Sequence, residues 1–225
     1  MLKSFLIIIN IHIFLGASQV ILVVASNNTT HKAILQRFDD GEKIGSPIDV
    51  NIGKNGLAYG LGITSLKLDA KEVDKKEGDK KAPIGIFELS YLFGYEKDDN
   101  YKMNYIQVDE NYTCVDDPQS KNYNSVLNFI DKEAKSFEYM KRDDVQYKLG
   151  IVVAHNDIQK PFAGSCIFIH VQKAVDAPTA GCTSMKFEDI KELVFWLDPK
   201  KKPVLIQVSK EHLDLVKKLY PNLVF

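Results

Sequence analysis

The sequence predicts a mostly β fold with a few helices (class α+β), arranged as one domain behind a short N-terminal leader. Short segments rich in β-branched and aromatic residues recur along the chain, and turn residues separate them. Helix-like spacing of apolar residues is confined to a few segments. The 225 residues, of which 45% are hydrophobic, are enough to bury one sizeable core, so a second domain is not required.

Residues 1–17 have the layout of a secretory signal peptide. Lys3 precedes an apolar run over residues 5–15, and small residues follow it at 16–18. The run is shorter than the roughly 20 apolar residues of a spanning helix. We therefore expect cleavage after Ala17, which leaves residues 18–225 as the mature domain. An uncleaved leader would instead tether the protein to a membrane, and that alternative is open.

Five segments in the first half of the mature chain are expected to form strands. They cover residues 19–25, 32–37, 47–52, 84–89 and 105–108. Residues 71–81 carry a dense mixed charge, which is typical of a solvated loop because unpaired charges are costly to bury.

The middle of the chain is expected to contain a helix followed by two strands. Apolar residues at helix-like intervals predict the helix over residues 125–142. Strands are predicted at 145–153 and 166–170, on either side of a polar loop at 155–164. That loop is expected to present polar groups beside a strand end.

The C-terminal region is expected to contain two helices around one strand. After Cys182, apolar residues spaced three and four apart predict an amphipathic helix from Phe187 to Leu197, with acidic residues in its first turn. A strand follows at 203–208. Ser209 is then expected to cap a closing helix.

The charge of the chain is almost balanced. There are 29 basic and 30 acidic residues, which gives a formal net charge of -1. This balance offers no overall field for holding nucleic acid or an anionic membrane surface. We expect a substrate that is small or uncharged overall.

Three cysteines are present, namely Cys114, Cys166 and Cys182. Thiols in an oxidising compartment tend to pair, and an odd count leaves at least one thiol free unless it pairs with another chain. A free thiol in an exported protein suggests a chemical role.

One pair of segments indicates nucleophilic chemistry. An apolar strand over residues 164–170 ends in His170, and the turn over 178–183 places Cys182 after Gly181, just before the predicted helix. A helix N-terminus offers unpaired N–H groups and a positive dipole, which lower a thiol pKa and can hold an oxyanion. Gly181 allows a substrate carbonyl to come close to the backbone.

His170 is the expected general base for this thiol. A connection of about a dozen residues joins it to the cysteine turn, which is enough chain to bring both side chains together. Such a histidine would take the thiol proton and return it to the leaving amine. The pattern alone also allows a core histidine and a buried structural thiol.

Both segments resemble the L,D-transpeptidase (YkuD-like) catalytic domain, in the bacterial branch with the motifs Gly-Ser-x-Ile-Phe-x-His and Pro-Thr-Ala-Gly-Cys. The resemblance extends from residue 19 to residue 208. Further segments resemble that branch in the same order, at residues 54–60, 76–87, 93–95, 115–124, 155–156 and 196–199.

The resemblance implies a β-sandwich-type catalytic domain that acts on peptidoglycan stem peptides without cofactor or metal, in the periplasm or cell envelope of a bacterium. Cys182 would attack the L-to-D amide of a tetrapeptide and release D-alanine, with His170 as base. The backbone of Gly181 and Cys182 would hold the oxyanion. An amine would resolve the thioacyl enzyme in a transpeptidase, and water in an L,D-carboxypeptidase. A carbapenem would acylate Cys182, and ordinary penicillins would do so poorly.

The resemblance also implies a set of substrate-binding residues, namely Tyr123, His155, Asn156 and Thr179. One feature departs from the wider family, in which Ser-His-Gly-Cys and a following arginine are common. Here Thr183-Ser184-Met185 follows Cys182, so the arginine that would pair with a substrate carboxylate is missing. Either His155 takes over part of that role, or the His155-Asn156 loop is structural.

Three competing hypotheses are left open. A papain-like or NlpC-type peptidase has its cysteine before its histidine, and His212 is the only histidine after Cys182; we expect it on the surface of the closing helix. A zinc site from His155, His170 and Cys182 lacks any short ligand pair. The third is a wall-binding module without activity.

The two remaining cysteines have two possible states. With Cys182 free for catalysis, Cys114 and Cys166 are the pair left to form a disulfide. Alternatively, each is a small buried hydrophobic residue.

Overall fold

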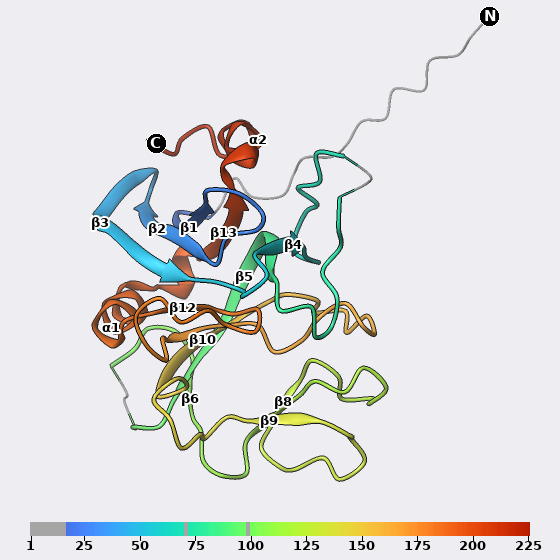
Figure 1. Ribbon diagram of the computed structural model, residues 1–225. Helices are drawn as coiled ribbons and strands as arrows, with labels where there is room; N and C mark the ends of the chain where they lie inside the picture. The colour runs from blue at the N-terminus through green and yellow to red at the C-terminus, as the bar shows by residue number, and fades with distance from the viewer. Residues whose placement is uncertain (1–16, 70–71, 98–99) are drawn as a thin grey trace, which may run out of the picture.

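The computed structural model describes residues 17–69, 72–97 and 100–225 (Figure 1). The predicted signal peptide therefore lies almost entirely outside the described residues. In the described ranges, no helix has the length and apolar character needed to cross a membrane.

Strands dominate the described chain, which confirms the predicted fold class. The strands are β1 (Gln19–Ala25), β2 (Lys32–Asp39), β3 (Glu42–Asn51), β4 (Leu57–Tyr59), β5 (Ala82–Gly94), β6 (Tyr105–Gln107), β7 (Thr113–Val115), β8 (Val126–Leu127), β9 (Phe137–Tyr139), β10 (Leu149–Val153), β11 (Phe168–Val171), β12 (Thr183–Met185) and β13 (Val204–Ser209). The helices are α1 (Phe187–Trp196) and α2 (Leu213–Leu219), with short 3-10 turns η1 (Pro199–Lys201) and η2 (Lys210–His212).

Most strands belong to one large sheet that closes on itself. Its order is β10-β11-β12-β3-β2-β1-β13-β5-β4, and β6 is added along β5. The long strand β5 pairs with β13 through residues 85–88 and with β10 through residues 89–94, so it joins the two ends of the order. The sheet thereby encloses a core on one side. Strands β10, β11 and β12 are neighbours in it.

Strand β1 lies in the middle of this sheet because both of its edges are paired. It runs parallel to β13 and antiparallel to β2, and its apolar side chains are almost all buried. Helix α1 packs against β10 and β11, and its buried residues are Ile190 and Val194, which the apolar spacing predicted, together with Leu193. Helix α1 thereby supports β11, which carries part of the candidate site.

A second, smaller sheet of order β8-β7-β9 lies apart from the large one, at the lower side of Figure 1. A disulfide between Cys114 in β7 and Cys166 just before β11 connects the two sheets. Around it is a second apolar cluster, which includes Phe93, Phe168 and Cys182.

The helix predicted over residues 125–142 is wrong, because that segment forms β8, a series of turns and β9. Phe129 and Ile130, two residues of the apolar pattern, are exposed. The Asp131 carboxylate accepts the Glu133 amide hydrogen, a side-chain contact that favours turns over helices. Strand β9 pairs with β7, which the disulfide holds in place.

Two smaller expectations also fail. Residues 71–81 are not fully solvated, since Lys75 is only 6% exposed. The hydroxyl of Ser209 does not cap a helix amide but contacts Glu211 and His212. In both places side chains form contacts that the composition of the segment does not indicate.

Candidate active site

The register of β11 and β12 brings Cys182 and His170 to one face. The strands are parallel, with Ile169 opposite Thr183 and His170 opposite Ser184. Cys182 directly precedes β12 and lies beside Phe168, whose amide N–H donates to Cys182 Sγ over 3.3 Å. Because alternate residues of a strand share a face, Cys182, Phe168 and His170 all lie on the same face.

The Cys182 thiol is buried and neutral. The residue is 8% exposed, and its S–H contacts the carbonyl oxygen of Cys166 at 3.5 Å. The pKa of Cys182 is raised to about 12, mainly by burial and also by the Glu138 carboxylate, while the cations Lys75 and Arg142 act in the opposite direction. A thiol with this pKa would need a base in order to react as a nucleophile near pH 7.

The expected contribution of a helix N-terminus to this thiol is wrong. Strand β12 and Lys186 lie between Cys182 and the first residue of α1, Phe187. The dipole effect fades within the first turn of a helix, so α1 does not lower the pKa of Cys182.

His170 is the candidate for that base. It is 4% exposed, and its Nδ1 lies 2.8 Å from the carbonyl oxygen of Val171. A carbonyl only accepts, so Nδ1 carries the proton and Nε2 is the unprotonated nitrogen of the neutral ring. Burial lowers the pKa of His170 to about 4, which keeps the ring neutral near pH 7.

Tyr147 fixes the orientation of the His170 ring. Its ring meets His170 edge to face, with centroids 5.3 Å apart, and its hydroxyl donates to Glu138 over 2.5 Å. The guanidinium of Arg142 stacks over the same tyrosine ring at 5.0 Å, and it also pairs with Asp144 through two hydrogen bonds. These side chains border the candidate catalytic pair on the side of β9.

Arg142 and Glu138 line a cavity of about 750 Å³. The arginine that many relatives carry after their cysteine is absent here, but the Arg142 charge acts on both His170 and Cys182. The sequence offered no signal for Arg142, because it lies 40 residues before Cys182 and in a segment for which a helix was predicted.

The turn before Cys182 is held by Thr179. Its hydroxyl donates to the Cys182 carbonyl over 2.6 Å and accepts from the Gly181 amide over 3.1 Å. Gly181 has φ 153°, and a Cβ there would lie 3.1 Å from the Lys81 carbonyl oxygen, so the position favours glycine. Of the two amides expected to hold an oxyanion, that of Gly181 is engaged in the turn.

A family model of the L,D-transpeptidase catalytic domain (YkuD) matches residues 18–206. The chain belongs to this family. Searches of curated proteins and of solved structures returned no match. The match spans both β11 and β12, and so includes the face on which Cys182 and His170 lie.

Around the candidate site of this L,D-transpeptidase domain, His155 and Asn156 form a buried hydrogen-bonded loop. His155 Nδ1 accepts from the Leu61 amide at 3.3 Å, and Nε2 donates to the Ala163 carbonyl at 3.1 Å. Asn156 is 0% exposed and donates to the carbonyl of Gly164 over 3.0 Å. The polar atoms of both side chains bind groups of the protein itself. This geometry supports the alternative in which the His155-Asn156 loop is structural.

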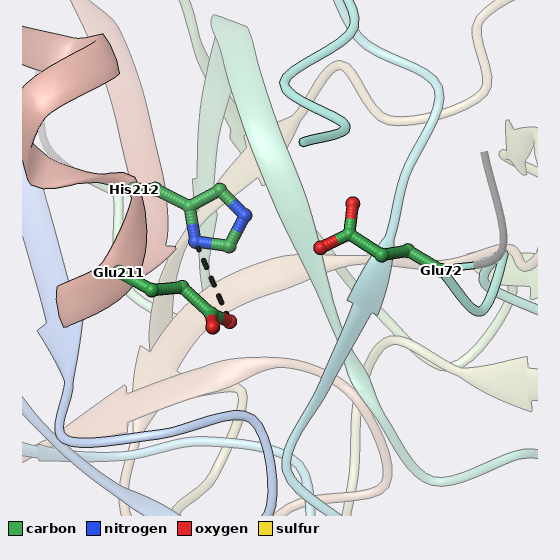
Figure 2. Close-up of side chains that lie close together, drawn as sticks. All are labelled: Glu72, Glu211 and His212. Atoms are coloured by element: carbon green, nitrogen blue, oxygen red, sulfur yellow. Dashed lines mark ion pairs between the residues drawn. The ribbon is translucent and has the colours of Figure 1, made fainter. Parts of the chain in front are cut away.

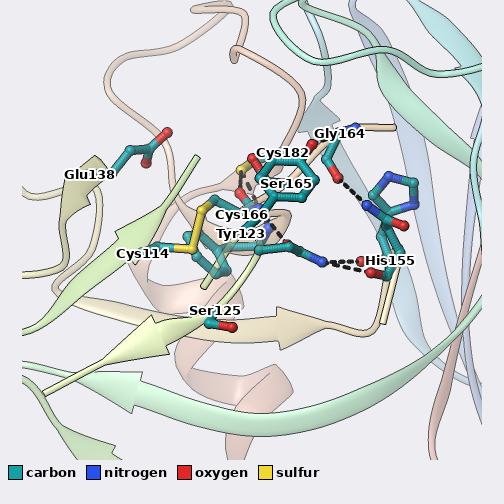
Figure 3. Close-up of a disulfide and its surroundings, with 12 residues drawn as sticks. Cys114, Tyr123, Ser125, Glu138, His155, Gly164, Ser165, Cys166 and Cys182 are labelled. Carbon is teal, nitrogen blue, oxygen red and sulfur yellow. Dashed lines mark hydrogen bonds between the residues drawn. A yellow bond between two sulfur atoms is a disulfide. The ribbon is translucent and has the colours of Figure 1, made fainter. Parts of the chain in front are cut away.

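Figure 3 shows the disulfide and the side chains around it, among them Tyr123 and His155. Tyr123 and Asn124 connect the loop to the disulfide. Tyr123 is 2% exposed, and its hydroxyl donates to Glu77 over 2.5 Å. The Asn124 amide group donates to the His155 carbonyl over 2.8 Å and accepts from the Cys166 amide over 2.9 Å. Sequence reasoning gave Asn124 no such bridging role and overlooked Glu77, whose segment was expected to be solvated.

The L,D-transpeptidase domain has one free thiol. Cys114 and Cys166 are bonded, so the disulfide alternative is confirmed and Cys182 is the free cysteine. We expect thiol titration of the denatured protein to give one thiol per chain without reductant and three with it. A count of three without reductant would contradict the bridge. The Cys182→Ser variant is the control, and it should lower the thiol count without reductant to zero.

His212, the histidine of the papain-like hypothesis, is not on the surface. It is 0% exposed, with Nδ1 2.9 Å from the Ser209 hydroxyl and Nε2 2.5 Å from the Tyr59 hydroxyl. The carboxylates of Glu72 and Glu211 lie on either side of its ring (Figure 2). Both ring nitrogens are thus engaged within a separate polar cluster, and neither serves Cys182.

Proposed function

We propose that this protein is an exported peptidoglycan L,D-transpeptidase that works through a thioacyl intermediate on Cys182. The observation that carries the proposal is the shared face of Cys182 and His170, together with the His170 tautomer that leaves Nε2 free to accept a proton. Membership of the L,D-transpeptidase family supports the same chemistry.

In the first half of the proposed reaction, Cys182 Sγ attacks the carbonyl carbon of the L-to-D amide in a stem tetrapeptide. His170 Nε2 takes the thiol proton as the S–C bond forms, which avoids a free thiolate in a buried site. The amide of Cys182, with that of Gly181 once it leaves Thr179, holds the oxyanion. His170 then gives its proton to the leaving nitrogen, and D-alanine departs.

In the second half, an amine from another stem peptide attacks the thioester. His170 takes a proton from the attacking amine and returns it to Sγ as the S–C bond breaks. The burial of Cys182 limits access of bulk water, which favours an amine over hydrolysis. With water as the acceptor, the same steps give an L,D-carboxypeptidase.

Incubation with defined tetrapeptide muropeptides, followed by mass spectrometry, tests this proposal. We expect crosslinked dimers and released D-alanine. Tripeptides without dimers would assign the carboxypeptidase activity instead. Unchanged tetrapeptide, under conditions in which the protein is folded, would contradict both. Cys182→Ser is the matched control, because it keeps the size of the side chain and removes the thiol.

A further inference from the structure

Lys75 is a buried cation beside the candidate nucleophile that has no part in the reaction as described so far. Its side chain is 4% exposed, although its neighbour Lys76 is exposed. Its Nζ donates to Asp79 Oδ1 over 2.6 Å and to the Lys76 carbonyl over 2.9 Å. A charge is costly to bury unless it is paired, so this geometry holds a charged ammonium at a fixed place.

The side chain of Lys75 extends from the 155–164 loop to the cysteine turn. A Cβ built on Gly164 would lie 3.0 Å from Lys75 Cγ, so the stem packs directly over that glycine. A Cβ built on Gly181 would lie 3.8 Å from Lys75 Nζ. The ammonium therefore borders the residue directly before Cys182.

The surroundings of Cys182 disfavour its thiolate, an effect that a nearby cation would offset. Burial and the Glu138 carboxylate both raise the pKa of Cys182, and the N-terminus of α1 lies too far along the chain to oppose them. Of the charged side chains that lower the pKa of Cys182, Lys75 has a larger effect than Arg142. Interactions between charges are stronger in a site without water, so a fixed cation there has a larger effect than on the surface.

We propose that Lys75 is a positioning residue whose buried ammonium stabilises the negative charge that develops at Cys182 Sγ and on the attacked carbonyl oxygen. The inference rests on the proposed role of Cys182. As the S–C bond forms, the C=O electron pair moves to oxygen and the thiol proton moves to His170 Nε2. Lys75 keeps all of its protons and supplies only charge.

The reactivity of the free thiol tests this inference without any substrate. Because Cys114 and Cys166 are bonded, iodoacetamide under non-reducing conditions adds one carbamidomethyl group to Cys182, with loss of iodide and of the thiol proton. We expect Lys75→Met to slow this alkylation about tenfold between about pH 7 and pH 10, since one pKa unit changes the thiolate fraction tenfold. Lys75→Arg should stay near wild type. Lys76→Met is the matched control and should change nothing.

A folded Lys75→Met protein, checked by its thermal unfolding, that reacts at the wild-type rate across this pH range would overturn the inference. If Lys75→Met does not fold, a double variant with Lys75→Gln and Asp79→Asn replaces the ion pair by a neutral pair of similar size. That variant should show the same slowing, and wild-type reactivity in it would equally overturn the inference. Failure of the muropeptide assay in wild type, with the alkylation effect intact, would contradict the proposed function and leave the role of Lys75 standing.

Discussion

Replacing Cys182 by alanine or serine is expected to abolish turnover of tetrapeptide muropeptides. Alanine removes the nucleophile, and the serine hydroxyl is far less acidic and less nucleophilic than a thiol. The measurement is D-alanine release, followed by mass spectrometry and compared with wild type at equal folded protein.

Cys182 is not the peripheral turn residue that its small neighbours suggest, so this variant needs a stability control. Its Sγ accepts the Phe168 amide hydrogen and lies within the apolar cluster around the disulfide. We expect Cys182→Ala to lower the free energy of unfolding by about 1–3 kcal/mol, and Cys182→Ser to lower it by a similar amount. A folded Cys182→Ala protein that keeps a substantial fraction of wild-type turnover would contradict the mechanism.

Replacing His170 by glutamine or alanine is expected to slow formation of the thioacyl enzyme by about 10²- to 10⁴-fold, the usual contribution of a positioned acid–base group. Single-turnover kinetics with a tetrapeptide donor measure this step directly. His155→Gln is the matched control, because His155 is also buried with its pKa lowered to about 4 but binds backbone groups of the loop. It should affect stability more than the rate, and a reversed order of the two rate effects would assign the base to His155.

The pH dependence follows from the same burial. The neutral form of His170 is the base, so activity is present above its folded pKa and lost below it. Because burial lowers that pKa to about 4, the acidic limb of the rate profile should lie near pH 4 instead of near the ordinary value of 6.5. A limb centred near pH 6.5 in folded protein would show that the ring is more hydrated than the structure indicates.

Local patterns predicted the large sheet well. The run at residues 19–25 coincides with β1, because β-branched residues fit a strand that is paired on both edges. The apolar spacing of Phe187, Ile190, Val194 and Leu197 likewise predicted α1. In such segments the spacing of the apolar residues decides which side chains face the core, so their structure depends little on distant parts of the chain.

Where distant contacts decide the structure, the patterns failed. Residues 125–142 have helix-like spacing, yet the disulfide and pairing of β9 with β7 impose a different geometry. The charged segment containing Lys75 was expected to be solvated, yet Lys75 is buried in an ion pair with Asp79. Neither contact is visible in the local sequence.

The candidate site was predictable in its parts but not in its arrangement. Cys182 and His170 were found from a cysteine turn, a strand end and a family resemblance. That they share one face depends on the register of β11 and β12, and the pKa of Cys182 depends on burial by the disulfide cluster. The sequence therefore predicted the candidate residues, while their electrostatics required the three-dimensional structure.

The most direct test of the central claim is the intact mass of the protein after incubation with the carbapenem meropenem. A carbapenem acylates an activated cysteine and leaves a stable mass increase on it. We predict one adduct on wild type, none on Cys182→Ala, and slow labelling of His170→Ala, with ordinary penicillins labelling poorly. An adduct that persists in Cys182→Ala, or labelling that does not depend on His170, would contradict the assignment of Cys182 and His170 as the catalytic pair.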